Sequence, residues 1–233
     1  MLKLLFLVFS QASCWLKHAG RVLCYLAVMP AIMLSAVQAE KAWYPVEVDV
    51  WNPPFNDQRQ REQKLYTPLE RAQKKWRIRV FIPHLKDDYW LGVNYGLIHE
   101  ARRLEVSLSI FEAGGYDQLE VQRRQIENAI AENPDGLIIG AISLDGLNDL
   151  VKKASDKGIP VLDLINGLSS PQIAARTAVS FWDMGFQAGS YLRVLQKKSG
   201  QPIKKAWYPG PNGAGWVKAG DAGHHRAIEG STN

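Results

Sequence analysis

Residues 76–116 read WRIRVFIPHLKDDYWLGVNYGLIHEARRLEVSLSIFEAGGY, which predicts a strand, a helix and a second strand. The run 76–82 is rich in β-branched and aromatic residues, and apolar residues occupy alternate positions of the run 106–111. Between them, residues 88–104 carry an acid in the first turn and two arginines in the last turn, which complements a helix dipole. Such a unit joins two parallel strands through a right-handed crossover.

The same alternation continues to about residue 196. Residues 119–132 predict an amphipathic helix, and Gly136-Leu-Ile-Ile-Gly140 is a short apolar run typical of a parallel strand covered on both faces. Further helices are expected at 145–157 and 184–195, and further strands at 159–164 and 175–179. We therefore predict an α/β fold with a doubly wound parallel sheet, forming one complete Rossmann-like lobe over residues 76–200.

After Gly200 the pattern starts again. Ala206-Trp-Tyr-Pro209 predicts a strand, Gly210-Pro-Asn-Gly-Ala-Gly215 a loop and residues 216–228 a helix. One strand and one helix are too few to bury a core of their own. We therefore expect residues 201–233 to be the incomplete start of a second lobe. The loop lacks the Gly-Lys-Ser/Thr sequence of a phosphate-binding loop.

The first 39 residues differ in composition from the rest. They contain basic residues but no acid, then an apolar run over residues 22–37, and small residues around Ala39. This order is typical of a secretory signal peptide, with cleavage predicted after Ala39 and delivery to the periplasm. The apolar run is shorter than the ~20 residues of a membrane-spanning helix, although an uncleaved anchor stays an alternative. Residues 40–75, rich in proline and charge, predict an irregular N-terminal arm. Val46 and Val48 alternate with acids, so a short strand here and pairing of the arm at its ends stay an alternative.

Composition excludes several classes of site. Both cysteines, Cys14 and Cys24, lie inside the signal segment, so the mature chain offers no disulfide, thiol nucleophile or cysteine-bound metal. Removing that segment lowers Lys plus Arg from 28 to 25 against 23 Asp plus Glu, so the net charge is about +2 and gives no reason to expect nucleic acid. No nucleophile–base motif, metal motif or cofactor fingerprint is present, so we expect no enzyme activity, no cofactor and no metal.

Two aromatic segments are the strongest functional signal. Lys86-Asp-Asp-Tyr-Trp90 and Glu112-Ala-Gly-Gly-Tyr116 each follow a predicted strand at its carboxyl end. Ligands of doubly wound sheets bind at that edge. Aromatic faces with few nearby charges suit a small ligand that carries a methylated cationic nitrogen. From the residues alone, packing of these rings on the sheet is an equally open interpretation.

Several motifs together carry a family resemblance. They are Leu85–Trp90, Asn94-Tyr-Gly96, Glu112–Tyr116, Met184-Gly185 and Pro209-Gly-Pro-Asn212, in this order and spacing. The sequence resembles the TorT family of type I periplasmic binding proteins. The resemblance implies two doubly wound lobes that close on trimethylamine N-oxide, and a partner in the periplasmic sensor domain of a TorS-like histidine kinase. TorT-like proteins continue through a full second lobe, so we expect a C-terminally truncated member that binds the ligand weakly.

The resemblance also implies a set of ligand contacts. Trp90, Tyr116 and either Trp182 or Phe181 are expected to cage the methyl groups, because the order of the last two leaves open which ring faces the ligand. The oxide oxygen needs donors, which indole N–H groups, phenol O–H groups and water supply without burying a charge.

Other residues have competing interpretations. Tyr89 and Asp87 are expected at the rim of the site. Arg102-Arg103 and Arg123-Arg124 predict solvated helix faces, with a basic surface for a receptor as the alternative. His224-His225 predict a solvated pair. A sugar-binding component of an ABC importer is the main alternative function, although sugars require more carboxylate, amide and guanidinium groups than these loops supply.

Overall fold

The computed structural model describes residues 44–50 and 61–229. The predicted signal peptide lies outside these residues. The chain divides into two compact units, one containing 44–50 and 61–68, the other containing the described residues from 69 onward. Among the described residues, no helix is long and apolar enough to cross a membrane.

The first unit is a two-stranded antiparallel sheet. Strand β1 (Val46–Val50) pairs with β2 (Glu62–Tyr66), with Val46 opposite Tyr66. An ion pair of 3.0 Å joins Arg61 to Asp49 across the sheet. The sequence predicted an irregular arm over residues 40–75, with a short strand at Val46 and Val48 and pairing at its ends as an alternative, and the described part contains such a strand and such a pairing. The alternation of valine with acids in β1 is the local pattern that favours the strand.

The second unit contains a parallel sheet of five strands in the order β4-β3-β5-β6-β7. The strand of this sheet that comes first in the sequence, β3, lies between β4 and β5, as doubly wound sheets require. The predicted α/β fold with a doubly wound parallel sheet is therefore confirmed. The strands are β3 (Arg77–Ile82), β4 (Ser107–Glu112), β5 (Gly136–Ile139), β6 (Val161–Leu164) and β7 (Ala175–Thr177).

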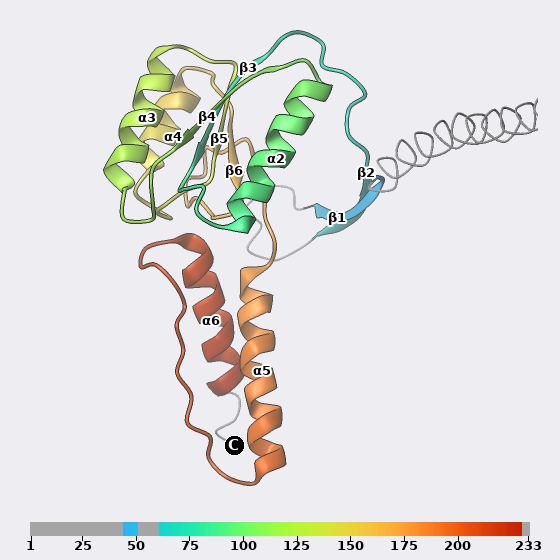
Figure 1. Cartoon of the computed structure of the whole chain (residues 1–233), viewed down its shortest axis with the longest axis vertical. Coiled ribbons are helices and arrows are strands. Elements are labelled where there is room, and N and C mark those ends of the chain that lie inside the picture. Colours follow the sequence, from blue (N-terminus) through green and yellow to red (C-terminus); the bar gives the residue numbers. More distant parts are fainter. Residues whose placement is uncertain (1–43, 51–60, 230–233) are drawn as a thin grey trace, which may run out of the picture. The chain divides into compact units, whose positions relative to one another are not determined.

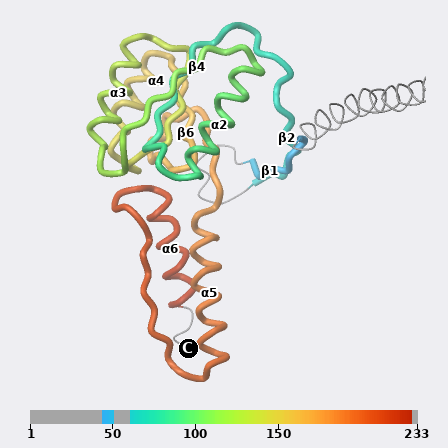
Figure 2. The backbone as a smooth tube through the Cα atoms, viewed as in Figure 1, coloured from blue at the N-terminus to red at the C-terminus, as the bar shows by residue number. Residues whose placement is uncertain are grey.

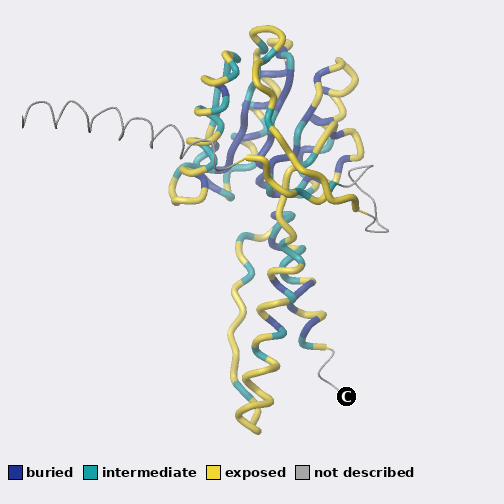
Figure 3. The backbone as a smooth tube through the Cα atoms, turned by 90° about the vertical axis from the view of Figure 1, so that its right-hand side faces the viewer, coloured by how far each residue is buried: buried dark blue, intermediate teal, exposed yellow. Residues whose placement is uncertain are grey.

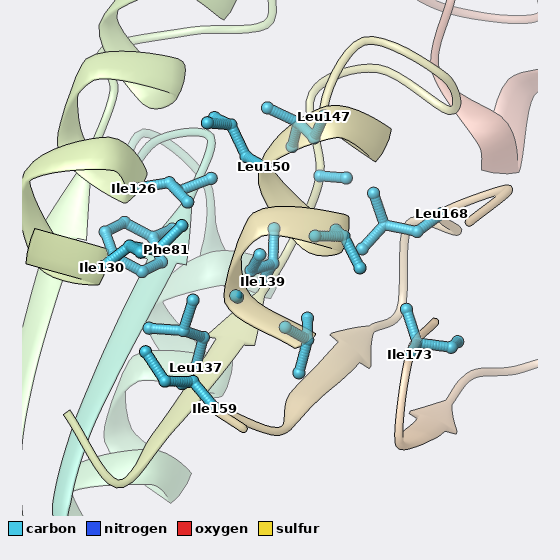
Figure 4. Close-up of a cluster of buried hydrophobic side chains, with 14 of the residues drawn as sticks. Phe81, Ile126, Ile130, Leu137, Ile139, Leu147, Leu150, Ile159, Leu168 and Ile173 are labelled. Atoms are coloured by element: carbon cyan, nitrogen blue, oxygen red, sulfur yellow. The ribbon is translucent and has the colours of Figure 1, made fainter. Parts of the chain in front are cut away.

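Three helices cover the two faces of this sheet (Figure 1). Helix α2 (Asp88–Arg103) lies on one face, and α3 (Leu119–Ala131) and α4 (Asn148–Asp156) lie on the other. Figure 4 shows the larger core, in which α3, α4 and the middle strands bury side chains such as Phe81. A smaller cluster, centred on Val80, Ile82 and Trp90, fills the α2 face.

Helix α4 begins later than predicted. The sequence placed its start at Asp145, but the helix starts at Asn148. The carboxylate of Asp145 instead accepts a hydrogen bond of 2.7 Å from the hydroxyl of Ser169 and pairs with Lys218 at 3.2 Å. These tertiary contacts hold Asp145 in the preceding loop. The predicted end is confirmed, because Gly158 follows the last turn with a φ of 72°.

A buried carboxylate fixes the chain after β6. Asp163 is fully buried, and one of its oxygens lies 2.6 Å from Nε of Arg176 on β7. The same side chain accepts backbone N–H groups of Leu168 at 2.9 Å and Gly167 at 3.2 Å. Burial raises the pKa of Asp163, while the charge of Arg176 opposes that shift. The carboxylate therefore ties the loop after β6 to the neighbouring strand.

Helices α5 (Phe181–Ser199) and α6 (Gly215–Glu229) pack against each other (Figure 2). A Cβ atom built on Gly185 would overlap the carbonyl oxygen of Gly220, and one on Gly189 would lie 2.8 Å from the carbonyl oxygen of His224. Only glycine allows the two backbones to approach so closely. From the sequence we predicted that the two helices belong to different lobes, divided at residue 200. Because they form one layer, we propose that the lobe changes before Phe181.

Residues 202–210 form no strand, contrary to the prediction for Ala206–Pro209. Within the described residues no strand pairs with this segment. A strand needs such pairing to satisfy the hydrogen-bonding groups of its backbone. Most of the segment is exposed in Figure 3. Its Trp207 ring stacks on His224 at 3.8 Å, and His224 is buried. The expected solvated histidine pair is therefore wrong for His224 and holds only for the exposed His225.

Candidate functional site

The loops that leave the sheet at its carboxyl edge bring polar and aromatic side chains together. His84 follows β3, Tyr116 follows β4, and Asn166 follows β6. The backbone after β5 completes this edge, since the carbonyl oxygen of Ala141 accepts a hydrogen bond of 2.9 Å from Asn166. Parallel strands end on the same side of a sheet, so residues far apart in the sequence meet here.

A connected set of aromatic rings occupies this edge, and we call it the aromatic cluster. His84 lies 5.5 Å from Tyr116 and 6.5 Å from Trp90 between ring centroids, both edge-on. Trp216 of α6 lies 6.2 Å from Tyr116 and 6.0 Å from Phe181 of α5. The cluster therefore consists of rings from the sheet edge and from the α5/α6 layer: His84, Trp90, Tyr116, Phe181 and Trp216, with Tyr89 beside Trp90.

Local sequence places the two central rings. Trp90 lies in the first turn of α2 and is only 2 % exposed. A Cβ atom on Gly140 would lie 2.7 Å from its ring, so glycine after β5 makes room for the indole. Gly114 has a φ of 100°, a left-handed conformation that glycine adopts readily, and the turn it makes carries Tyr116 toward His84.

Tyr116 is a neutral hydrogen-bond donor at this edge. Its phenol oxygen accepts the amide of Asn166 at 3.0 Å, which leaves its own proton available to an acceptor. Burial raises the pKa of Tyr116, and the hydrogen bond from Asn166 opposes this shift without reversing it. The phenol is therefore protonated at neutral pH. Burial also raises the pKa of Tyr89, so that phenol stays neutral as well.

Trp216 brings a second donor. Its indole Nε1 is buried and has no hydrogen-bond partner within the described part of the chain. The start of α6 is held against the sheet edge, because Leu144 donates its N–H to the carbonyl oxygen of Gly213 at 3.0 Å. A Cβ atom on Gly215 would lie 2.6 Å from the carbonyl oxygen of Asn166, so this approach also requires glycine. A buried, unpaired N–H beside aromatic faces suits a ligand with an acceptor atom.

The structure brings most of the predicted site residues together. Trp90, Tyr116, Tyr89 and Phe181 belong to the aromatic cluster. The ring of Trp182 instead stacks on Phe186 at 5.1 Å within α5. This places Phe181, and not Trp182, beside Trp216.

Three contributors to this edge were not among the predicted site residues. Trp216 directly follows the glycine-rich loop 210–215. That loop was the sequence feature that could have indicated Trp216, because such loops commonly lie at a ligand-binding edge. His84 lies just past the carboxyl end of β3, so its position relative to the strand could have indicated it. Asn166 also follows a strand directly, which from the sequence indicates a position at the cleft or hinge, and the structure adds its contact with Tyr116.

Asp87 has a structural contact that the sequence analysis did not anticipate. It is the N-cap of α2, and its carboxylate accepts the backbone N–H of Trp90 at 2.9 Å. We predict that Asp87→Ala lowers the free energy of unfolding by about 1 kcal/mol, the usual value for a lost cap, while Asp87→Asn keeps the free energy of unfolding within a few tenths of a kcal/mol of the wild-type value. Urea denaturation of the two variants checks this. Equal losses in both variants would contradict the capping role.

The raised pKa of Tyr116 predicts a pH dependence of stability. Folding that raises the pKa above the ordinary value of about 10 favours the protonated phenol, so its contribution is complete below pH 10 and declines as the pH rises further. Thermal unfolding followed from pH 8 to pH 11 should therefore show a shallower decline for Tyr116→Phe than for the wild type. Tyr95→Phe is the control, because that ring is 72 % exposed. Parallel curves for wild type and Tyr116→Phe would contradict the assignment.

Comparison with known proteins places these observations in a family. Residues 78–204 match the model of a periplasmic binding protein domain. The chain is 38% identical to the periplasmic protein TorT of Escherichia coli K12 over 165 residues, which are 71% of this chain and 46% of the relative. The chain thus spans about half the length of the curated relatives it matches.

Solved structures agree with this match. An ABC transporter solute binding protein from Bradyrhizobium sp. BTAi1, with bound Bis-Tris, is 48% identical at a TM-score of 0.65, over 81% of this chain and 56% of that one. A carbohydrate transporter solute binding protein from Agrobacterium radiobacter, in complex with D-arabinose, is 17% identical at a TM-score of 0.59. It covers 69% of this chain and 55% of that one, and at this identity it supports the fold alone.

Proposed function

The chain belongs to the periplasmic binding protein family, and on that basis we propose that its aromatic cluster binds trimethylamine N-oxide or a closely related methylated amine. We further propose that the protein is exported by the N-terminal signal segment and presents the bound ligand to a membrane sensor histidine kinase. The observation that carries the ligand assignment is the pairing of aromatic faces with two available donors, the phenol of Tyr116 and the buried indole N–H of Trp216.

Trimethylamine N-oxide has a methylated end that suits the aromatic faces and an oxide end that suits the two donors. Its methyl groups carry spread positive charge, which aromatic faces attract by about 0.5–2 kcal/mol per well-placed ring. Its oxide oxygen is an acceptor, and Trp216 Nε1 and Tyr116 Oη would both donate to it. The carboxylate of Asp87 lies 3.8 Å from Nε2 of His84 and would attract the methylated nitrogen, while the two donors bind the oxide.

The relatives support an amine ligand. TorT is a curated relative at 38% identity, and the segments that contain Trp90 and Tyr116 are among those that resemble its family. The 48% identical solute binding protein has bound Bis-Tris, which is a tertiary amine with hydroxyl-bearing arms. The bound tertiary amine of this relative supports a ligand with a substituted nitrogen.

Ligand binding would change the ring contacts. Tyr116 and Trp216 touch each other edge-on at 6.2 Å, so a ligand that sits between them has to separate the rings. The α5/α6 layer carries Trp216 and Phe181 and would move with that separation. A ligand can shift such an equilibrium only by its differential affinity for the two arrangements, and this shift is the signal that a kinase partner would detect.

A second candidate function is solute capture for an ABC importer, including sugar import. Its support is the name of the 48% identical relative, which is an ABC transporter solute binding protein. Sugar recognition needs several charged or amide groups around the hydroxyls. The cluster offers Asn166 as its amide, and that side chain is already bonded to Tyr116 and Ala141. We therefore favour the methylated amine over a sugar.

Calorimetric titration with trimethylamine N-oxide, choline and ribose tests the ligand class. We expect saturable binding of trimethylamine N-oxide, weaker binding of choline, which lacks the oxide, and no heat from ribose. Because the Tyr116–Trp216 contact has to be displaced, we expect dissociation constants near the millimolar level, about 4 kcal/mol of binding free energy. Tight ribose binding without a response to trimethylamine N-oxide would overturn the proposal in favour of the importer.

A further inference from the structure

A groove of ≈ 1190 Å³ lies along the outer edge of the sheet, between α2, β4 and the segment 71–75. Its floor is apolar and includes Leu104 after α2 together with Val106, Leu108 and Ile110 of the β4 region. None of the rings of the aromatic cluster lines it. The groove is therefore a concave surface distinct from the proposed ligand site.

The backbone at this edge is available for pairing. β4 is the outermost strand of the sheet and pairs only with β3 among the described strands. Ser107 donates its N–H to Trp76, and Ala113 donates its N–H to Ile82, so the odd-numbered residues of β4 face β3. Because successive residues of a strand point their backbone groups to opposite sides, Leu108 and Ile110 direct theirs outward.

Positive charge surrounds the groove. Its lining contains five basic side chains and two acids, Glu105 and Glu112. Lys74 pairs with Asp135 at 2.9 Å, and Arg103 pairs with Glu100 at 2.7 Å. The other three basic side chains are exposed and form no ion pair within the described ranges: Arg71, Lys75 and Arg102.

The contrast with α3 shows that this charge is not simply structural. Arg123, on the opposite face of the sheet, is held by two hydrogen bonds to Asp149, at 2.8 Å and 2.6 Å. At the groove, the unpaired cations instead flank an apolar floor and an open strand edge. Open edges of this kind accept extended chains, and a basic rim selects acidic ones.

We propose that this groove binds an extended acidic segment of a partner protein, which adds to β4 as a sixth strand of the sheet. Outward N–H and C=O groups of Leu108 and Ile110 bond to the added strand. Alternate apolar side chains of the partner cover the floor, and its acids meet Arg71, Lys75 and Arg102. The proposal does not depend on which ligand the aromatic cluster holds.

A fluorescein-labelled peptide of alternating glutamate and valine, titrated with the full chain, tests this proposal by fluorescence anisotropy. We expect saturable binding that weakens as sodium chloride is added. The triple variant Arg71→Gln, Lys75→Gln, Arg102→Gln should lower the affinity about 10-fold, since each exposed pair contributes about 0.2–1 kcal/mol. Arg124→Gln, an exposed arginine on α3, is the matched control and should bind as the wild type does.

Two changes to the peptide keep the test independent of the folding of any variant. Methylation of alternate backbone nitrogens of the peptide removes its strand donors and should abolish binding. Replacement of its glutamates by lysine should also abolish binding, because the basic rim repels a cationic peptide. In the unmodified complex, the amides of Leu108 and Ile110 should become protected from hydrogen exchange. Equal binding of the methylated or lysine peptide would overturn the proposal. A dimer of the chain that the triple variant dissociates would also overturn it, because the occupant would then be a second copy.

Discussion

The variant Gly185→Ala should lose about 3 kcal/mol of stability, with the loss confined to the α5/α6 layer. A Cβ atom at residue 185 overlaps the backbone of Gly220, and a backbone atom cannot rotate away as a side chain can. The two helices therefore have to move apart, which also loosens Trp216 at the start of α6. Hydrogen exchange resolves the effect by region, with faster exchange in α5 and α6 and unchanged exchange in β3 and β5.

The matched control is Gly96→Ala in α2. No atom lies within 4 Å of a Cβ atom built there, so alanine should stabilise the helix by up to about 1 kcal/mol. The two variants make the same chemical change in helices of one chain. The opposite signs of their stability changes therefore isolate the effect of the close approach of α5 and α6. A Gly185→Ala variant as stable as Gly96→Ala would show that this approach does not occur in solution.

The variant Trp216→Ala should lower the affinity for trimethylamine N-oxide by about 30-fold. It removes an aromatic face worth about 0.5–2 kcal/mol and a hydrogen bond worth about 0.5–1.5 kcal/mol, together about 2 kcal/mol. Tyr116→Phe removes only a donor and should cost less, near 5-fold, at about 1 kcal/mol. Titration of each variant, followed by tryptophan or tyrosine fluorescence, measures both losses.

Trp182→Ala separates the two aromatic candidates of α5. The ring of Trp182 stacks on Phe186, whereas Phe181 contacts Trp216, so Phe181→Ala should weaken binding and Trp182→Ala should leave it nearly unchanged. Circular dichroism shows whether each variant keeps its helices. A larger loss for Trp182→Ala than for Phe181→Ala would reverse our placement of these rings at the ligand.

The sheet could be predicted because its signals are local. Gly136–Ile139 is a short apolar run, and Gly158 ends α4 with the left-handed conformation that a helix stop commonly uses. The packing of α5 on α6 could not be predicted in the same way. It depends on the approach of Gly185 to Gly220 and of Gly223 to Trp182 across two helices, and a single helix sequence does not show which residue it will contact.

The candidate site likewise contains residues that local sequence predicts and residues that only tertiary contacts place. Trp90 and Tyr116 could be predicted at this edge because each lies in the segment that follows a strand, and strand ends meet at one edge. Trp216 comes from a helix whose position is set by contacts such as that of Leu144 with Gly213, which the sequence does not display. Asp87 was expected at the ligand, but its spacing of three residues from Trp90 fits an N-cap contact equally well.

The central claim is that Trp216 and Tyr116 bind the oxide oxygen of trimethylamine N-oxide within the aromatic cluster. Nuclear magnetic resonance of the indole N–H group of Trp216, assigned with Trp216→Phe, tests this most directly and suits weak binding. Titration with trimethylamine N-oxide should move this resonance downfield in a saturable way, and trimethylamine, which lacks the oxide, should not. An indole resonance of Trp216 that stays unmoved while the ligand saturates the protein would contradict the claim.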